Sequence, residues 1–178
     1  MNTYKTEGVV LKKRNFGEAD RILTLFSKHF GKIQILAKGI RKTTSRKSGS
    51  LELFNQVRIF VARGKNLDIV TEAEVVNSFS SWRKDLKKIA LAYYYSELVD
   101  KLTVEESPNE EVFDLLTNSF INLSQEFQDR KIFARSLLEE TGFWPKGKEI
   151  DRIDLDNFIE RITEKKIISR KTFKDFVY

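Results

Sequence analysis

The chain of 178 residues contains no cysteine and only one histidine. The absence of cysteine excludes disulfide bonds, thiolate nucleophiles and cysteine-ligated zinc, and it fits a reducing compartment better than secretion. A single imidazole cannot form a histidine-rich metal site. His29 stands in "FSKHFGK" just before a glycine, which is typical of a polar turn residue. We therefore expect no metal and no other cofactor.

The sequence also lacks a long apolar run. No segment approaches the roughly 18 apolar residues that a membrane-spanning helix needs, and the charged N-terminus has no signal-peptide core. Apolar residues make up 40% of the chain and charged residues 33%, which is typical of a folded domain with a densely charged surface. These features predict a globular cytoplasmic protein.

Positive charge is concentrated in the first part of the chain. Residues 1–80 carry 15 basic and 7 acidic side chains, a net charge of +8, whereas residues 81–178 have a net charge of −2. Such a field steers polyanions towards the basic part. The sequence therefore indicates a basic binding module at residues 1–80, joined to a nearly neutral domain at 81–178.

The basic part has the pattern of a β-domain. Short runs rich in Val, Ile and Phe are bounded by glycine or charge, which predicts strands at 6–14, 21–27, 32–38, 53–62 and 67–79. The second run is apolar on both of its alternating faces, which favours barrel closure over a solvated face. The fold class expected is an N-terminal all-β OB-fold barrel followed by an all-α helical domain.

The second part has helical periodicity. Val112, Leu116 and Phe120 recur at intervals of four residues, and Gly142 with Pro145 provides a helix stop. Helices are expected at 80–102, 112–127, 155–166 and 169–177, and a further one begins near residue 129 and is closed by Gly142. The segment 144–152 is the most plausible tether.

An OB-fold binds single strands across its second and third strands and through the loops between strands 1 and 2 and strands 4 and 5. Those two loops offer cations and one ring suited to phosphate contact and base stacking. The candidate residues are Arg14, Phe16, Arg21, Arg63 and Lys65.

A basic loop follows the third expected strand, in "ILAKGIRKTTSRKSG" (35–49). A flexible cationic loop can neutralise several phosphates without reading sequence. The alternative is a solvated loop that only keeps the protein soluble. Its candidate phosphate contacts are Lys38, Arg41, Lys42, Arg46 and Lys47, and Lys12 and Lys13 are added by charge.

Catalytic motifs are scarce. The chain has no phosphate-binding GxxxxGK[ST] loop, no GxSxG elbow and no HExxH motif. Glu18 and Asp20 would suit a metal-dependent nuclease, but acids in a turn between basic strands more often pair with Arg14 or Arg21. We expect a protein that is not an enzyme.

The ordered series "TEGVVLKKRNFGEADRILTLFSKHFGKIQILAKGIRK" and "TEAEVVNSF" resembles the RecO family of bacterial recombination mediators. A looser match continues through "LAYYYSELVDKLT" and "NEEVFDLL" to "LLEETGFWP". The resemblance implies an OB-fold and a helical domain, binding of single- and double-stranded DNA, strand annealing, and loading of RecA with RecR onto DNA coated by the single-strand-binding protein SSB. The family's basic motif positions here are Arg14, Arg21, Lys38, Arg41 and Lys42.

The sequence departs from that family after "GFWP", where many members carry a zinc module of the CxxC type. Without cysteine no such site is expected, and the short helices from residue 154 onwards are expected to close the domain instead. A docking site for the SSB tail is expected in the helical half, and the oligomeric state expected is a monomer. The candidates for tail binding are Trp82, Arg83, Lys84, Lys87 and Lys88.

Two interpretations therefore stay open. In the first, the barrel binds DNA as the family resemblance implies. In the second, it binds RNA or serves only as a protein-assembly adaptor. The sequence cannot separate DNA from RNA, because both are polyanions and stacking tolerates any base.

Overall fold

The computed structural model describes residues 2–125, 129–148 and 153–176, and the backbone alone for 173–176. The chain divides into two compact units. The barrel unit comprises Met1–Ser78 and Glu105–Phe113, and the helical unit comprises Phe79–Val104 and Asp114–Tyr178. The chain therefore passes from one unit to the other three times.

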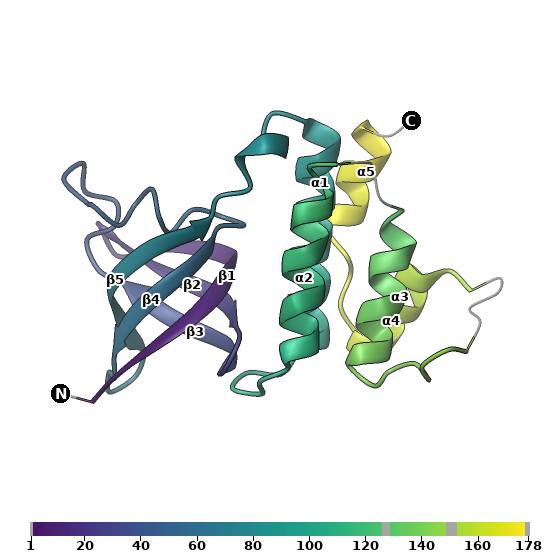
Figure 1. Ribbon diagram of the computed structural model, residues 1–178, viewed down its shortest axis with the longest axis horizontal. Helices are drawn as coiled ribbons and strands as arrows, with labels where there is room; N and C mark the ends of the chain where they lie inside the picture. The colour runs from purple at the N-terminus through teal and green to yellow at the C-terminus, as the bar shows by residue number, and fades with distance from the viewer. Residues whose placement is uncertain (1, 126–128, 149–152, 177–178) are drawn as a thin grey trace. The chain divides into compact units, whose positions relative to one another are not determined.

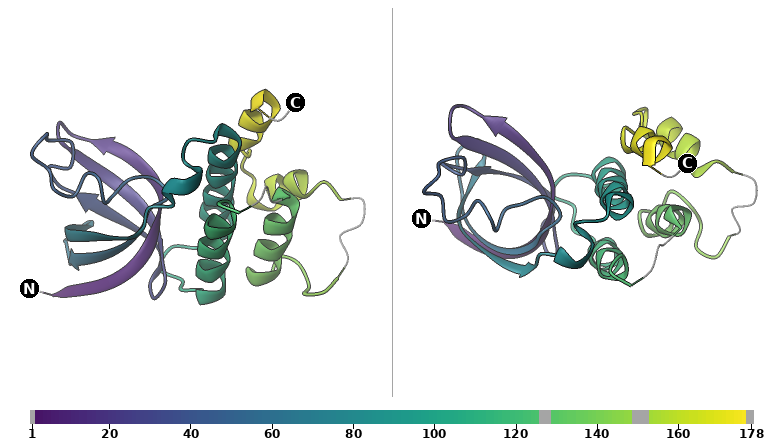
Figure 2. Two further views of the ribbon diagram at one scale, coloured as in Figure 1. Left: turned by 45° about the horizontal axis from the view of Figure 1, so that its top comes forward. Right: turned by 90° about the horizontal axis from the view of Figure 1, so that it is seen from above.

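Five strands form a closed barrel in the order β1-β2-β3-β5-β4 (Figures 1 and 2). This confirms the expected five-stranded barrel of the OB type. The strands are β1 (Thr3–Phe16), β2 (Asp20–Ser27), β3 (Gly31–Ala37), β4 (Gln56–Ala62) and β5 (Asp68–Asn77).

Strand β1 is long enough to serve two neighbours. Its first half pairs with β4, from Thr3 opposite Ala62, and its second half pairs with β2, up to Phe16 opposite Asp20. An irregularity between Val10 and Lys12 marks the transition, and such bulges bend a strand. A short parallel pairing of β3 with β5, at only two residue pairs, closes the barrel.

The barrel core is built from aliphatic side chains. Leu23, Leu25 and Phe26 are fully buried and Ile22 nearly so, which confirms that β2 is covered on both of its faces. Ile40 and Leu51, from the connection between β3 and β4, join the same core cluster. The connection is therefore anchored at two points.

Strand β4 begins at Gln56, three residues later than the predicted start at residue 53. Phe54 has a φ of 69°, which is incompatible with an extended strand. The buried side chain of Asn55 donates to the carbonyls of Gly49 and Ser50, at 3.2 and 2.9 Å. These local hydrogen bonds hold the chain in a turn before the strand starts.

The helical unit follows the expected periodicity. A 3₁₀ turn, η1 (Ser80–Trp82), precedes α1, which begins at residue 86 and not at 80 because the Asp85 carboxylate accepts from the amides of Lys87 and Lys88 as an N-cap. Within the described ranges, no helix is long and apolar enough to cross a membrane. The helices are α1 (Leu86–Leu102), α2 (Glu110–Asn122), α3 (Arg130–Glu140), α4 (Leu155–Thr163) and α5 (Ser169–Phe176).

The helix ends differ slightly from expectation. Helix α2 ends at Asn122 rather than at residue 127, which lies outside the described residues. Helix α3 ends just before Gly142, whose φ of 78° suits a left-handed helix terminus and agrees with the expected stop. Residues 149–152 of the expected tether also lie outside the described ranges.

The segment between α1 and α2 belongs to the barrel unit. Glu105 forms a bridge with Lys32 of β3, and the Glu106 amide donates to the Lys32 carbonyl at 2.9 Å. Gly31 has a φ of 66°, and a Cβ there would lie 2.1 Å from the Ser107 carbonyl oxygen. Only glycine permits this approach, so the edge of β3 is covered by a segment distant in sequence.

Candidate nucleic-acid interface

The turn between β1 and β2 is joined to the start of the basic loop. The Gly39 amide donates to the Asp20 carboxylate at 2.7 Å, and the Arg41 amide donates to the Ala19 carbonyl at 2.9 Å. The Arg41 guanidinium also donates to the Glu18 carbonyl at 2.9 Å. These bonds hold two segments, some twenty residues apart in sequence, at one end of the barrel.

Five predicted DNA contacts meet there. Arg21 lies opposite Ala37 in the β2–β3 register, directly before Lys38, and Arg14 lies opposite Ile22 on the neighbouring strand. Among the described residues, Arg14, Lys38 and Lys42 have no ion-pair partner, while Arg21 only donates to the Asn15 side chain, at 3.1 Å. We call this group the cationic end; its members are Arg14, Arg21, Lys38, Arg41 and Lys42.

Hollows flank Lys38 on two sides. One of about 590 Å³ lies between the β1–β2 turn and Lys42, and one of about 500 Å³ lies between the basic loop and β5. A cation between two open hollows remains accessible to a polyanion. The cationic end is thus suited to phosphate contact.

Of the two acids in the same turn, Asp20 binds the backbone, since its carboxylate accepts from the Gly39 amide. Glu18 contributes its backbone carbonyl, which accepts from Arg41. No group of three or more metal-ligating side chains occurs in the part of the chain that the structure describes. The expected pairing of Glu18 or Asp20 with Arg14 or Arg21 is not seen either.

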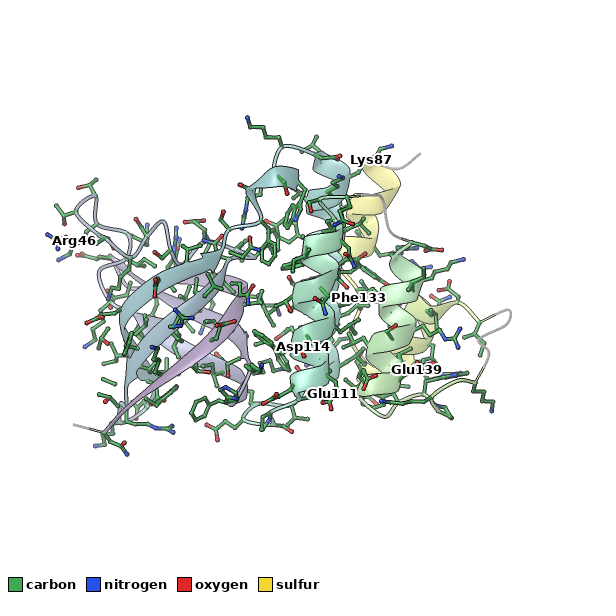
Figure 3. The ribbon with its side chains drawn as sticks, viewed as in Figure 1. Arg46, Lys87, Glu111, Asp114, Phe133 and Glu139 are labelled. Carbon is green, nitrogen blue, oxygen red and sulfur yellow. The ribbon has the colours of Figure 1, made fainter. Side chains whose placement is uncertain are left out.

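The rest of the basic loop contacts the barrel. The sequence predicts a flexible loop, and the structure gives a series of turns, with the Lys47 ammonium donating to the Val70 carbonyl at 3.0 Å. Arg46 is exposed at the tip of this segment (Figure 3). Of the two cations added by charge, Lys13 pairs with Glu52, whereas Lys12 is exposed.

The loop between β4 and β5 lies elsewhere. Arg63 pairs with Asp68 at 3.3 Å and stacks over the Tyr4 ring, 4.6 Å from its centroid. Tyr4 lies at the start of β1, while Phe16, 48% exposed, lies at its other end beside the cationic end. The structure therefore brings Phe16 to the cationic end but places Arg63, and the exposed Lys65 near it, at the opposite end of β1.

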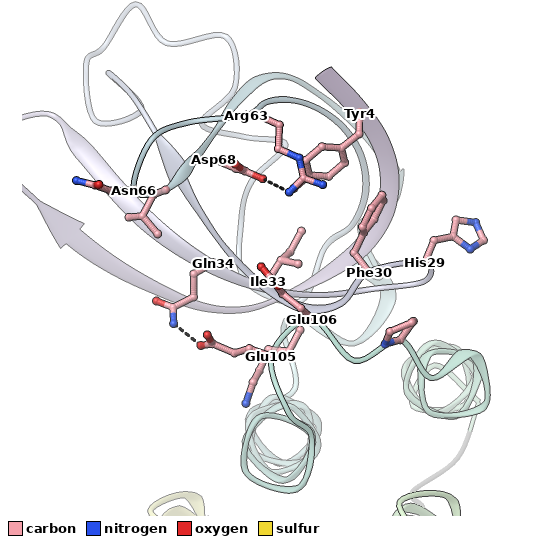
Figure 4. A pocket seen from close by; sticks show the side chains of 13 residues that line it. Tyr4, His29, Phe30, Ile33, Gln34, Arg63, Asn66, Asp68, Glu105 and Glu106 are labelled. Atoms are coloured by element: carbon pink, nitrogen blue, oxygen red, sulfur yellow. Dashed lines mark hydrogen bonds and ion pairs between the residues drawn. The ribbon is translucent and has the colours of Figure 1, made fainter. Parts of the chain in front are cut away.

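A cavity of about 430 Å³ opens beside this loop, where β3 and β5 hardly pair (Figure 4). Arg63, Asp68 and Tyr4 form one side, and Gln34 with Glu105 forms the other. Burial and a hydrogen bond to Asp68 raise the pKa of the Tyr4 hydroxyl, so that it remains a donor at neutral pH. We call this space the seam cavity.

Sequence reasoning missed most of the seam cavity. Tyr4, Gln34, Asp68 and Glu105 gave no signal, because they come from four separate segments that meet only when the barrel closes. His29 was expected in a turn and lies there, 3.3 Å from Glu110 through its Nδ1. Of the named lining residues, Arg63 is the one that the sequence marks as a binding candidate.

The candidate tail-binding residues are divided by burial. Trp82 is only 1% exposed, and its indole donates to the Phe120 carbonyl at 2.8 Å, so its ring is a core residue and offers no docking surface. Arg83 lies over that ring, 5.5 Å from its centroid. Lys84 and Lys87 are exposed and Lys88 is half-buried. Figure 3 shows Lys87 at the start of α1.

The helical unit uses its cations differently. Asp156 of α4, 4% exposed, accepts from the Tyr94 hydroxyl at 2.6 Å and pairs with Arg130 at 2.9 Å. Arg170 approaches the same carboxylate at 3.6 Å. Burial and the Asp156 charge raise the pKa of Tyr94, so its hydroxyl stays protonated. This cluster joins α1, α3, α4 and α5.

Two family models match the chain. The model described as "Recombination protein O N terminal" matches residues 1–79, and "Recombination protein O C terminal" matches residues 83–147. The boundary between the matches falls where the barrel gives way to helices.

Curated relatives agree with these matches. A DNA repair protein RecO of Pelotomaculum thermopropionicum is 44% identical over 116 residues, which cover 65% of this chain and 45% of the relative. One from Dehalococcoides mccartyi strain ATCC BAA-2266 is 40% identical over 149 residues, and one from Acetivibrio thermocellus is 35% identical over the same length; each covers 82% of this chain and 59% of the relative. This chain thus spans about half the length of the relatives it matches. With both family models and the five-stranded barrel in agreement, the chain belongs to the RecO family of DNA repair proteins.

Proposed function

We propose that this chain binds the backbones of single- and double-stranded DNA through the cationic end and anneals complementary strands. The observation that carries the proposal is the meeting of five basic side chains at one end of the barrel, three of them without an ion-pair partner among the described residues. An exposed cation that is not held by an acid can exchange small counterions for phosphates.

Annealing follows from where such contacts fall. Phosphate contacts position a strand but leave its base edges free to pair. Neutralising two backbones at once lowers their mutual repulsion. Phe16, exposed beside the cations, offers a ring for stacking that any base can use.

The wider role is proposed from the family. The chain, acting in the bacterial cytoplasm and close to the nucleoid, works with RecR to help load RecA onto SSB-coated DNA, and it makes or breaks no covalent bond itself. For the SSB tail, the cations Lys84, Lys87 and Lys88 are the retained candidates, without the buried Trp82.

Salt dependence tests the DNA-binding step. Fluorescence anisotropy of a labelled single strand, titrated at several salt concentrations, is expected to give a log–log slope of about −0.7 per neutralised phosphate, hence about −3.5 for the five cations. Annealing rates of complementary DNA and RNA strands, with and without SSB, identify the preferred nucleic acid. Absent or salt-independent binding would contradict the proposal, and faster annealing of RNA would redirect it to RNA.

A further inference from the structure

The seam cavity lies apart from the cationic end and has a different chemical character. It opens where β3 pairs with β5 at only two residue pairs, and the edge of β3 is bordered there by Glu105 and Glu106. Its volume of about 430 Å³ is within the range of small-ligand pockets. Its charges differ from those of the surrounding barrel.

A phosphate is a poor ligand for this cavity. Its lining includes three carboxylates, those of Asp68, Glu105 and Glu106, against the cations Arg63 and Lys32. His29, which also borders it, points away (Figure 4). On a barrel with a strongly positive field, the cavity is therefore locally acidic, and a second anion would be repelled.

A flat neutral group fits better, because a stacking platform is already in place. The Arg63 guanidinium is held between the Tyr4 ring, 4.6 Å away, and Asp68, at 3.3 Å. Asp68 is held in turn by the Gly64 amide, at 3.1 Å. The Arg63 side chain still remains 48% exposed, which leaves part of its plane for a nucleobase to stack on.

The opposite side of the cavity supplies hydrogen-bond acceptors. Glu105 accepts from the Gln34 amide at 2.5 Å through one carboxylate oxygen, and Glu106 is exposed next to it. Carboxylates accept from the exocyclic amino group of cytosine, whereas thymine presents a carbonyl oxygen at the same position. A pyrimidine with an amino group is thus favoured over one without it.

We propose that the seam cavity binds one unstacked nucleobase of a single strand, stacked on Arg63 and preferring bases with an exocyclic amino group. This inference rests on the proposed binding of single strands, and it adds a base-dependent contact to a backbone-dependent one. A protein side chain carrying a guanidinium is the competing occupant.

The first test varies the bases at constant phosphate number. Oligonucleotides of about 15 nucleotides, near the upper site size of one OB-fold, are compared as dC, dT and abasic backbones at one salt concentration and slightly alkaline pH. We expect dC to bind the full chain about tenfold more tightly than the abasic strand, consistent with one stacked base, and dT to fall between them.

The second test removes the flat platform and keeps its charge. Arg63→Lys is expected to abolish most of the difference between dC and abasic strands while leaving the salt slope unchanged. Arg46→Lys, at the exposed tip of the basic loop, is the matched control and should preserve that difference. Glu105→Gln should reduce the preference for dC over dT.

A third measurement is independent of backbone binding. Deoxycytidine, thymidine and N-acetylargininamide are titrated into the ¹⁵N-labelled chain, and amide shifts of residues 63–68 are followed by NMR. Shifts with deoxycytidine that exceed those with thymidine support the base site.

The outcomes separate the two proposals. If all three backbones bind equally and with salt dependence, the base site is refuted while the proposed DNA binding stands. If no strand binds but deoxycytidine shifts these amides, the proposed DNA binding fails and the base site stands. Shifts with N-acetylargininamide alone would assign the cavity to a protein partner and overturn the inference.

Discussion

The basic side chains of the cationic end and those of the helical unit's ion pairs are used in opposite ways. In the helical unit, basic side chains pair with acids, as in Arg130 with Asp156, Lys101 with Glu97 and Lys146 with Glu140. At the cationic end, by contrast, Lys38 and Lys42 have no such partner among the described residues. Basic residues thus hold acids in ion pairs in one part of the molecule and leave an available surface in another.

The difference shows why net charge alone is a coarse guide to function. A paired cation cannot be offered to a phosphate without breaking its ion pair, so the 17 basic side chains of residues 81–178 contribute little field beside 19 acids. Beside the cationic end, Asp20 is committed to a backbone amide, and Lys38 and Lys42 are left to solvent. The comparison can be tested by removing charges from each unit in turn.

The largest effect is expected on stability, from Asp156→Ala. The change leaves Arg130 and the Tyr94 hydroxyl without their buried partner, which should lower the free energy of unfolding by about 3 kcal/mol. Urea denaturation followed by circular dichroism measures the loss. Lys146→Ala, which removes the exposed partner of Glu140, is the control and should cost under about 1 kcal/mol. Equal losses would mean that the buried cluster is no more important than a surface pair.

The next effect is expected on DNA affinity, from replacing Lys38, Arg41 and Lys42 together by alanine. Removing three phosphate contacts should weaken single-strand binding at least about tenfold and reduce the salt slope by about 2. Fluorescence anisotropy measures both quantities.

The matched control for that variant replaces Lys146, Lys148 and Lys166 of the helical unit by alanine. Lys146 and Lys166 pair with Glu140 and Glu160, and Lys148 lies over the Trp144 ring. Binding should change little. An equal loss in both triple variants would show that the cationic end is ordinary surface.

A smaller effect is expected from pH. Burial raises the pKa of Glu97, but hydrogen bonds from Ser169 and the Ile168 amide, with the Lys101 charge, lower it by more, so its net shift is downward. A carboxyl pKa that is lower in the folded state than in the unfolded state stabilises the fold. This stabilisation is fully present at pH values above the pKa of the unfolded state, and it is lost as the pH falls through the pKa of the folded state. The start of α5 should therefore loosen in acid.

Hydrogen exchange of the amides at Ile168 and Ser169 reports this loosening. Glu97→Gln should lower the free energy of unfolding by about 1 kcal/mol at neutral pH, since the charge-assisted bonds become neutral ones. The same variant should show a weaker pH dependence of the free energy of unfolding, from the ordinary carboxyl pKa down to more acidic pH. An unchanged pH profile in this variant would assign the acid sensitivity to other groups.

The parts predictable from sequence are those determined by local pattern. Alternation on β2 and glycine-bounded runs predicted the barrel, and four-residue spacing from Val112 predicted α2. The cationic end was also predicted in outline, because its cations lie in two short segments. One segment flanks the turn between β1 and β2, and the other follows β3, which pairs with β2. Strand β4 and helix α1 begin later than predicted. Their starts are set by the positive φ of Phe54 and by the Asp85 N-cap, and hydrophobic periodicity reveals neither.

The parts not predictable depend on distant residues meeting. Tyr4 reaches Arg63 only because Thr3 lies opposite Ala62 in the β1–β4 register, and Asp68 reaches the same place through its parallel pairing with Ile35. Trp82 looked like a surface ring beside lysines, and its burial depends on Phe120, which lies in another helix. Tertiary packing decides such cases, and a single sequence carries little signal for it.

The contact of Gly31 with Ser107 also affects how the protein can be divided for experiments. An expression fragment that stopped at the end of β5 would lack Glu105 and Glu106 and would leave part of the β3 edge with unpaired backbone groups. Uncovered strand edges of this kind promote association between chains. A fragment meant to isolate the barrel should therefore carry residues 105–113 as a grafted extension, and a simple truncation would be expected to aggregate.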